Sequence, residues 1–364
     1  MNIGILGATG HAGKAVALKL LSERAGTPVL FGRDPAKLEK LRESLQPLAP
    51  SNLETAILDV RDQDSLERAF RRIDFLVIAL SSSENLPSVV SAALITGTDC
   101  LDILLCSREK RDFLESHEKL FKERGLSYIT DGGYHPGIPG IMARRAEELS
   151  PGLHSVDVYG SFGINWGSKR FACETVADFL RELKSMDMSV LKDGQWQSSW
   201  KNIKRFDFCD GRGRKDCVAM GMDEMRLLGR HIPSLRNAGF YIAGFGQAID
   251  WGVMPLSLGL LFLFPDAERQ IARFFGLGVR MFGGEQEWAE MRLRGKGKSG
   301  SIDIAISYGD PYELTALPVV ACIRQYADTP CRPGLWLQAL YLDPSRFWAD
   351  LEEMGVRLSI TVNS

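Results

Sequence analysis

The sequence predicts an α/β fold, with an N-terminal Rossmann domain on a doubly wound parallel sheet and a second α+β domain with a mixed or antiparallel sheet. A glycine-rich turn joins an apolar strand at residues 1–6 to an apolar-periodic helix at residues 14–23. Strand and helix patterns then alternate through residue 150. The 364 residues exceed one typical domain, so we expect two, over residues 1–135 and 136–364.

The glycine turn, GATGHAG, has the pattern of a dinucleotide site. Gly7 lets the chain turn sharply off the strand, Gly10 lets the backbone approach a pyrophosphate, and Gly13 lets the helix pack against the sheet. The helix N-terminus then holds the phosphates through its N–H groups and dipole. The expected cofactor contacts in this turn are Gly7, Ala8, Thr9, Gly10, His11, Ala12 and Gly13. The alternative is a tight strand-to-helix turn without a ligand.

Further elements of the first domain follow from apolar runs bounded by polar or glycine-containing turns. Strands are expected at residues 28–31, 55–60, 75–80, 99–104 and 127–130. Helices are expected at residues 35–45, 64–71, 87–96 and 108–124. Because ligands bind at the carboxyl ends of such strands, the residues that follow each strand are the site candidates.

The end of the second strand bears on the choice between the two nicotinamide cofactors. NAD sites place a carboxylate there for the ribose 2′-hydroxyl, whereas NADP sites tend to place an arginine for the 2′-phosphate. Arg33 follows this strand, and Lys37 lies one helical turn further on. Asp34 is the other candidate, but Asp34-Pro35 is also a standard helix start, with aspartate as N-cap. We therefore expect NADP rather than NAD, with solvated surface charge as the alternative for Arg33 and Lys37.

The next two strand ends supply further candidate cofactor contacts. Asp59 follows the third strand and is placed to touch the adenine edge, together with the Val60 backbone. A turn aspartate that caps the next helix is the alternative for Asp59. Ala79, Leu80 and Ser81 follow the fourth strand and are expected near the ribose and nicotinamide.

Five segments together resemble the saccharopine dehydrogenase (saccharopine reductase-like) family, in its uncharacterised bacterial branch. They are GILGATGHAGK with FGR, GTDCLDI, GGYHPGIPG, YELTA, and GLWLQALYLDPSRFWADLEEMGV. The resemblance implies an NADP-binding Rossmann domain and a second domain that binds substrate and forms a homodimer. That family usually carries an acidic residue just before Pro-Gly in the turn GGYHPGIPG, where this chain has His135. A substrate other than saccharopine is therefore expected.

The expected chemistry is hydride transfer, in which the protein orients the substrate and manages one proton. His135 is the first candidate for the proton donor because an intrinsic pKa near 6.5 suits acid–base work, and a turn residue bonded to backbone is its alternative. Tyr134 is the next candidate. Asp102, at the end of the fifth strand, is the third, with a structural hydrogen-bonding carboxylate as the alternative. Later candidates, for binding an anionic substrate, are Lys169, Arg170 and Glu174.

The sequence lacks the motifs of several other enzyme classes. No tyrosine has a lysine four residues later, as short-chain dehydrogenases require, and no GxSxG, HExxH or paired-cysteine spacing occurs. No metal is therefore expected. The substrate is expected to be a small molecule with a C=N, C=O or enoyl bond. The other hypothesis is a non-catalytic NADP-binding protein that senses redox state and acts through a partner.

The second domain is expected to contain strands at residues 155–163, 204–209, 218–221 and 301–308 and a helix at 175–186. Residues 210–215 and 296–300 have the composition of hairpin loops. A helix at 312–328 is expected to return to the Rossmann domain. The apolar run 252–264 is too short to span a membrane. We expect it to be a buried helix or a cavity wall for a hydrophobic substrate, with peripheral lipid contact as the alternative.

Composition limits the partners and the compartment. A net charge of −2 gives no reason to expect nucleic acid as a partner. The chain starts directly with strand and glycine turn rather than with an apolar signal segment. Its seven cysteines are odd in number and scattered, which favours free thiols in a reducing cytoplasm.

Overall fold

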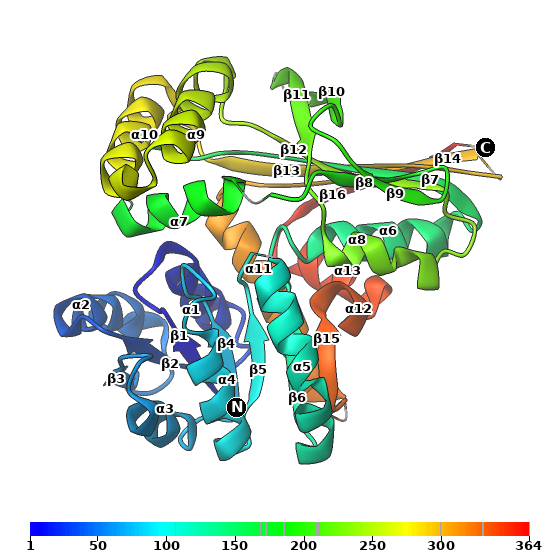
Figure 1. Cartoon of the computed structure of the whole chain (residues 1–364). Coiled ribbons are helices and arrows are strands. Elements are labelled where there is room, and N and C mark those ends of the chain that lie inside the picture. Colours follow the sequence, from blue (N-terminus) through cyan, green and yellow to red (C-terminus); the bar gives the residue numbers. More distant parts are fainter. Residues whose placement is uncertain are drawn as a thin grey trace. The chain divides into compact units, whose positions relative to one another are not determined.

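The computed structural model divides into two compact units (Figure 1). Unit 1 comprises Met1–Ile141 and Tyr312–Gly355, and unit 2 comprises Met142–Pro311 and Val356–Ser364. The structure describes residues 1–105, 107–167, 169, 171, 173–184, 186–208, 212–298, 300–329 and 331–363. Unit 1 is therefore built from two separate stretches of the chain, and the segment after residue 311 belongs to it almost entirely.

Unit 1 is organised around a parallel sheet in the order β15-β6-β5-β4-β1-β2-β3, and the predicted doubly wound fold is confirmed. Its strands are β1 (Asn2–Leu6), β2 (Thr27–Gly32), β3 (Thr55–Ile57), β4 (Phe75–Ile78), β5 (Asp99–Asp102), β6 (Ser127–Thr130) and β15 (Gly334–Leu337). Strand order reverses beside β1, which pairs with β2 on one side and β4 on the other. The carboxyl ends of β1 and β4 thus form the switch point at which such folds bind ligands.

The strands of this sheet are apolar because helices cover both faces. All four residues of β4 have no exposed surface. The helices of unit 1 are α1 (His11–Ser22), α2 (Pro35–Leu45), α3 (Gln63–Phe70), α4 (Leu86–Thr96), α5 (Arg108–Arg124), α11 (Pro311–Asp328), α12 (Gln338–Tyr341) and α13 (Pro344–Glu353). The third strand ends at Ile57 rather than at the expected residue 60, because β3 is an edge strand and the chain turns away.

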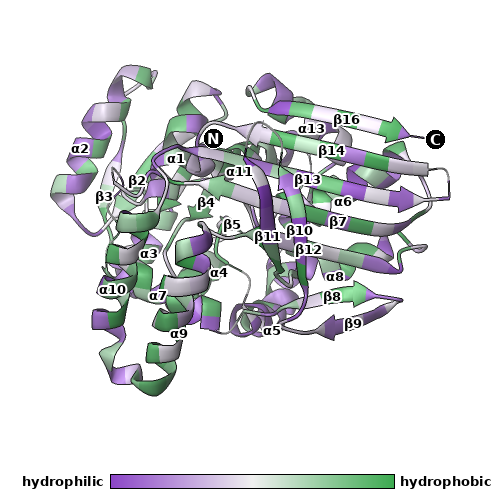
Figure 2. Ribbon diagram, turned by 90° about the horizontal axis from the view of Figure 1, so that it is seen from above, coloured by the Kyte–Doolittle hydropathy of each residue, from purple (hydrophilic) through white to green (hydrophobic). Residues whose placement is uncertain are grey.

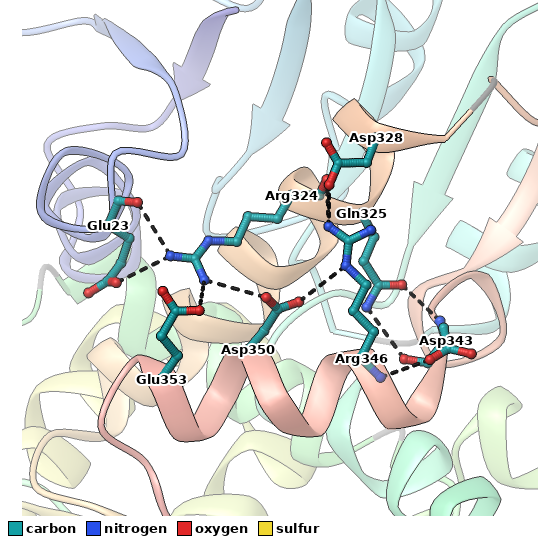
Figure 3. Close-up of polar contacts among 8 residues, drawn as sticks. All are labelled: Glu23, Arg324, Gln325, Asp328, Asp343, Arg346, Asp350 and Glu353. Carbon is teal, nitrogen blue, oxygen red and sulfur yellow. Dashed lines mark hydrogen bonds and ion pairs between the residues drawn. The ribbon is translucent and has the colours of Figure 1, made fainter.

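The late segment of unit 1 is tied to its first helix by Arg324 of α11. The guanidinium donates to the Glu23 carbonyl at 3.3 Å and lies 3.4 Å from the Glu23 carboxylate. It also pairs with Asp350 at 3.4 Å and Glu353 at 3.3 Å, both on α13 (Figure 3). The Arg324 guanidinium therefore joins α11 and α13 to the end of α1, which lies about 300 residues earlier in the sequence.

Unit 2 contains a nine-stranded mixed sheet in the described part of the chain. Its main order is β10-β11-β12-β7-β13-β14-β16, with β8 and β9 attached beside β12. Only the β12–β7 pair is parallel among the described pairs. The strands are β7 (Leu153–Gly163), β8 (Ser189–Lys192), β9 (Gln195–Ser198), β10 (Ile203–Phe208), β11 (Gly213–Ala219), β12 (Asn237–Ala243), β13 (Trp288–Gly297), β14 (Gly300–Tyr308) and β16 (Arg357–Asn363). Parts of the two expected loops, residues 210–211 and 299, lie outside the described residues, as does residue 209 of the strand expected at 204–209.

Helices α7 (Cys173–Lys184), α9 (Met254–Leu263) and α10 (Glu268–Phe282) form a cluster beside this sheet. Unit 2 also contains α8 (Asp223–Arg226) and most of α6 (Ile138–Leu149), whose residues 138–141 belong to unit 1. Leu180, Leu261 and Phe275 are buried in the core of the cluster. The expectation that residues 252–264 are buried is wrong for one side of α9, where Phe262 is 74% exposed. Nearly every position of this helix is apolar, so periodicity did not distinguish its inner from its outer face.

Candidate functional site

The glycine turn is built by close backbone contacts at the β1–β4 switch point. Gly7 has φ +89°, and a β-carbon there would clash with the carbonyl oxygen of Ala79. A β-carbon at Gly13 would clash with the carbonyl oxygen of Gly7. The Gly7 and Ala8 N–H groups both donate to the Phe31 carbonyl, at 3.3 and 3.1 Å. Only glycine therefore allows the turn to pack so tightly against β2, β4 and α1.

Gly10 differs from these two glycines because there is more free space where its β-carbon would be. A β-carbon at Gly10 would meet only the Gly7 carbonyl oxygen, at 3.3 Å. Gly10 is also the N-cap of α1, and no side chain caps that helix. The first-turn N–H groups of His11, Ala12 and Gly13 therefore form the donor set that suits a phosphate, and the turn fits the pyrophosphate of a dinucleotide. Thr9 contributes a methyl group that faces Gly32.

The end of β2 carries an exposed basic side chain. Arg33 is exposed, and Lys37 is 72% exposed with its Nζ atom 3.5 Å from Asp34 Oδ2. Asp34 accepts a hydrogen bond from the Lys37 N–H at 3.1 Å, and Pro35 stands at the start of α2. The interpretation of Asp34 as an N-cap is therefore confirmed.

Asp59, after β3, contacts Arg61 and does not cap the next helix. It accepts from the Arg61 N–H at 3.0 Å and pairs with the Arg61 guanidinium at 2.6 Å. This pairing, with a smaller effect from nearby Arg33, holds the pKa of Asp59 well below its usual range. The alternative that Asp59 caps α3 is wrong, because Asp62 is the cap. Sequence reasoning missed Arg61, although it follows the third strand by the same logic as Arg33.

The remaining predicted cofactor contacts lie at the same edge of the sheet. Ala79 donates its N–H to the Leu6 carbonyl at 2.8 Å, which joins the ends of β1 and β4. Leu80 is partly buried and Ser81 is exposed. The Val60 side chain is 9% exposed and packs into the core of unit 1.

A buried charge cluster lies beyond β5 and β6. Lys110 Nζ lies 3.1 Å from Asp102 Oδ1 and 2.7 Å from Asp131 Oδ1, and it donates to the Leu104 carbonyl at 3.0 Å. Asp102 also accepts from the Leu104 N–H at 3.1 Å. The three charged side chains are at most 2% exposed. These contacts favour the structural alternative for Asp102, because its carboxylate is enclosed and paired.

Lys110 and Asp131 were not among the predicted site residues. Lys110 belongs to a run of charged residues at the start of α5, which resembles an exposed helix face in the sequence. Asp131 adopts φ +57° at the beginning of the glycine turn that follows β6. The pair therefore fixes the start of that turn from within unit 1.

Gln338, the first residue of α12, is fully buried against the same turn. A β-carbon at Gly132 would lie 3.0 Å from its Oε1 atom, and one at Gly137 would lie 2.9 Å from its Nε2 atom. Gly132 donates its N–H to the Asp102 carbonyl at 2.9 Å. The turn thus packs between the end of β5 and a side chain about 200 residues later in the sequence, which local patterns could not indicate.

His135 lies in this turn next to Tyr134, with ring centroids 4.7 Å apart in an edge-on arrangement. Its Nδ1 atom is enclosed, and burial lowers the pKa of His135 to about 4. The imidazole is therefore neutral at pH 7, and the intrinsic pKa near 6.5 assumed from the sequence does not apply here. Tyr134 is 3% exposed.

The later candidates from the sequence lie in unit 2, where they form ion pairs. Lys169 Nζ is 2.9 Å from Glu287 and 3.0 Å from Asp310. Glu174 pairs with Arg269 at 2.9 Å. Arg170 lies outside the described residues. Among the residues that are described, no three His, Cys, Asp or Glu side chains are placed to hold a metal ion.

Comparison with known proteins agrees with this geometry. Residues 7–99 match a family model described as NAD(P)H-binding. No curated protein matches the chain. Among solved structures, saccharopine dehydrogenase (L-Glu forming) from Saccharomyces cerevisiae aligns over 100% of both chains, with 15% identity and a TM-score of 0.71.

The chain has the saccharopine dehydrogenase fold. The resemblance in the sequence motifs is thereby confirmed at the level of the fold. A multiply substituted meso-dapdh from Clostridium tetani, solved with DAP, aligns over 97% of this chain and 98% of its own, with 13% identity and a TM-score of 0.50. The family match over the glycine turn supports a nicotinamide cofactor.

Proposed function

We propose that the protein is an NADP-dependent oxidoreductase that transfers hydride between the nicotinamide and a small-molecule substrate. The observation that carries this proposal is the turn at Gly10, which lies at the switch point of the sheet. There the backbone has space beside it for a ligand, and no side chain caps the N-terminus of α1. The NAD(P)H-binding match over residues 7–99 and the fold of a dehydrogenase support it.

The preference for NADP rests on the basic residues after β2 and β3. Arg33, Lys37 and Arg61 are all exposed, and Arg33 lies close enough to Asp59 to lower its pKa. A 2′-phosphate carries two negative charges and favours an arginine, whose donors are arranged for bidentate contact. Asp34 is engaged as a helix cap, which leaves Arg33 as the side chain to contact the 2′-position.

Residues 7–13 would hold the pyrophosphate, and Ala79, Leu80 and Ser81 would lie beside the ribose and nicotinamide. The cofactor supplies the hydride when it is bound, and the protein orients the substrate. We assign substrate contact to His135 and Tyr134, with the imidazole acting in its neutral form because of its low pKa. Asp102 positions the turn through the Lys110 cluster. The substrate is a C=N, C=O or enoyl compound other than saccharopine, since His135 replaces the acidic residue of that family.

The second unit would also form a homodimer, through β16. This strand is the edge of the unit 2 sheet (Figure 2), and Ile360 and Val362 are 39% and 53% exposed on it. An exposed edge strand is a template for pairing with another chain. Antiparallel pairing about Ile360 would match Leu358 with Val362 and Ser359 with Thr361 of the second copy, so the strand is self-complementary. Ile360→Lys would place like charges opposite each other and give monomers in sedimentation experiments, whereas Ile57→Lys on β3 would not.

A non-catalytic redox sensor is the second candidate, and the low pKa of His135 favours it because a neutral imidazole is a poor acid. His135→Ala separates the two candidates. In an enzyme, loss of this contact lowers turnover by roughly 10²-fold while cofactor affinity is kept. Unchanged turnover would remove the role assigned to His135.

The first experiment is a parallel titration of the protein with NADPH and NADH, followed by nicotinamide fluorescence. Arg33→Ala is expected to weaken NADPH binding and to leave NADH binding almost unchanged. Arg71→Ala is the matched control, since Arg71 is 55% exposed at the far end of α3. If the protein binds neither nucleotide, the oxidoreductase proposal fails.

A further inference from the structure

Many of the exposed apolar side chains of unit 2 lie on helices α9 and α10 or directly after α9. Phe262, Leu263 and Phe264 lie at the end of α9 and are 74%, 67% and 58% exposed. On α10, Leu277 and Met281 are 59% and 74% exposed. With Phe274, which is 40% exposed, these residues define what we call the α9–α10 surface.

The α9–α10 surface is the outer side of a well-packed helix cluster. The same helices bury Leu261, Ile271, Phe275 and Val279 against α7. Because the inner positions are already filled, the outer side chains are not needed for the core of unit 2. Contiguous exposed apolar side chains on a protein surface mark a site of contact with a partner or a membrane.

The exposed side of α10 is divided lengthwise into an apolar and a basic stripe. Phe274, Leu277 and Met281 follow one another at spacings of three and four residues, so they share one stripe. Arg273 and Arg280 are seven residues apart and lie beside it. Such a pattern, with arginines flanking an apolar stripe, is typical of helices that lie in the interface of a bilayer.

The cations around this surface are only partly paired with carboxylates, and one of the pairs joins Arg181 of α7 to Glu268 of α10. Arg269 pairs with Glu174, but Arg273, Arg280 and Lys184 form no ion pair among the described residues. Lys184 Nζ lies 5.9 Å from the ring centroid of Phe262, so a cation stands directly beside the apolar end of α9. Long basic side chains can rest on an apolar surface and extend their charge to the headgroup level. The charges therefore complement an anionic surface.

We propose that the α9–α10 surface docks onto an anionic lipid bilayer, with α9 and α10 lying in its interface. No helix within the described residues is long and apolar enough to cross a membrane, so the contact is peripheral. A second copy of the chain is the less suitable occupant, because a two-fold contact through this surface would bring together the Arg273 and Arg280 side chains of two copies, which carry like charge.

The test is co-sedimentation of the full chain with vesicles. One set consists of phosphatidylcholine alone, and the other of equal parts phosphatidylcholine and phosphatidylglycerol. The wild type is expected to bind the anionic vesicles more tightly. Leu277→Ser with Met281→Ser is expected to lower that affinity by about tenfold or more, because two large side chains no longer leave water. Arg273→Gln with Arg280→Gln is expected to abolish most of the preference for anionic lipid, at about fivefold per charge.

Trp200→Ser is the matched control, since Trp200 is 71% exposed elsewhere in unit 2. All variants are first shown to keep the wild-type circular dichroism and thermal midpoint, and Phe262→Ser is a second, independent apolar variant. Failure of the wild type to bind anionic vesicles overturns the proposal. So does equal binding by wild type and both apolar variants. If Leu277→Ser with Met281→Ser instead dissociates an oligomer, the surface is a contact between copies, and the lipid proposal is wrong.

Discussion

Lys110 Nζ lies 2.7 Å from Asp131 Oδ1, and the two side chains are each 2% exposed. The ammonium also contacts Asp102, so one buried cation is shared by the carboxylates that end β5 and follow β6. Both carboxylates are shielded from solvent, and pairing with the ammonium offsets the cost of burying their charges. The cluster thereby fixes the turn that presents His135.

Removal of this cation should destabilise unit 1 strongly. Lys110→Met leaves two buried carboxylates without a partner, and the expected loss is about 3–5 kcal/mol in the free energy of unfolding. Urea denaturation measures it. Lys119→Met, in the same helix but 85% exposed, should change stability by less than about 0.5 kcal/mol. Similar losses in both variants would contradict the assignment of Lys110 to a buried cluster.

The low pKa of His135 predicts a pH dependence of stability. The folded protein holds this imidazole neutral down to about pH 4, whereas the unfolded chain takes up the proton near its ordinary value of 6.5. Stability is therefore full above 6.5 and is lost as the pH falls from 6.5 towards 4. Since the residue is partly exposed, the loss is on the order of 2 kcal/mol.

His135→Asn should remove this pH-dependent part of the stability. The difference in the free energy of unfolding between wild type and variant should therefore shrink as the pH falls from 6.5 towards 4. Denaturant midpoints measured at several pH values give the comparison. Replacement of the exposed His154 by Asn serves as the control. If the denaturant midpoints of wild type and His135→Asn changed in parallel with pH, the lowered pKa of His135 would be refuted.

The two glycines at the start of α1 should respond differently to alanine. Gly13→Ala forces a methyl group against the Gly7 carbonyl and should cost about 1–3 kcal/mol of stability. Gly10→Ala has only one neighbour, at 3.3 Å, and should leave the thermal midpoint almost unchanged while weakening NADPH binding. Fluorescence titration beside thermal unfolding separates the effects. Equal affinity of wild type and Gly10→Ala for NADPH would show that no phosphate approaches there.

Asp34 should act on stability rather than on cofactor choice. Asp34→Ala loses the hydrogen bond to the Lys37 N–H and should cost about 1 kcal/mol. Asp34→Ser can still cap α2 and should recover most of that loss. Neither variant should change the ratio of NADPH to NADH affinity. A marked shift of that ratio in both variants would instead place the carboxylate at the ribose.

Local features of the sequence predicted the first unit well. The glycine turn, the Asp34-Pro35 helix start and the apolar strands each act over a few residues, so the chain reveals them without knowledge of the fold. The helix expected at residues 108–124 has the bounds of α5, Arg108–Arg124. Its charged side chains, however, look alike in sequence, and only the fold reveals that Lys110 points inward.

Features that depend on distant segments were not predictable. Gln338 packs against the Gly132–Gly137 turn because α12 follows β15, which pairs with β6. The lowered pKa of His135 likewise comes from burial, which the local sequence does not reveal. On α9, nearly every residue is apolar, so no periodic pattern marked the exposed face that carries Phe262.

The late placement of β15 affects how the protein is made. Strand β6 ends at Thr130, but its neighbour β15 begins only at Gly334. Tyr326 of α11 likewise donates a hydrogen bond to Asp99 of β5. A ribosome must therefore synthesise all of the intervening second unit before the first sheet gains its last strand. Until that point in translation, the β6 edge of the sheet has no neighbouring strand on the side that β15 later occupies.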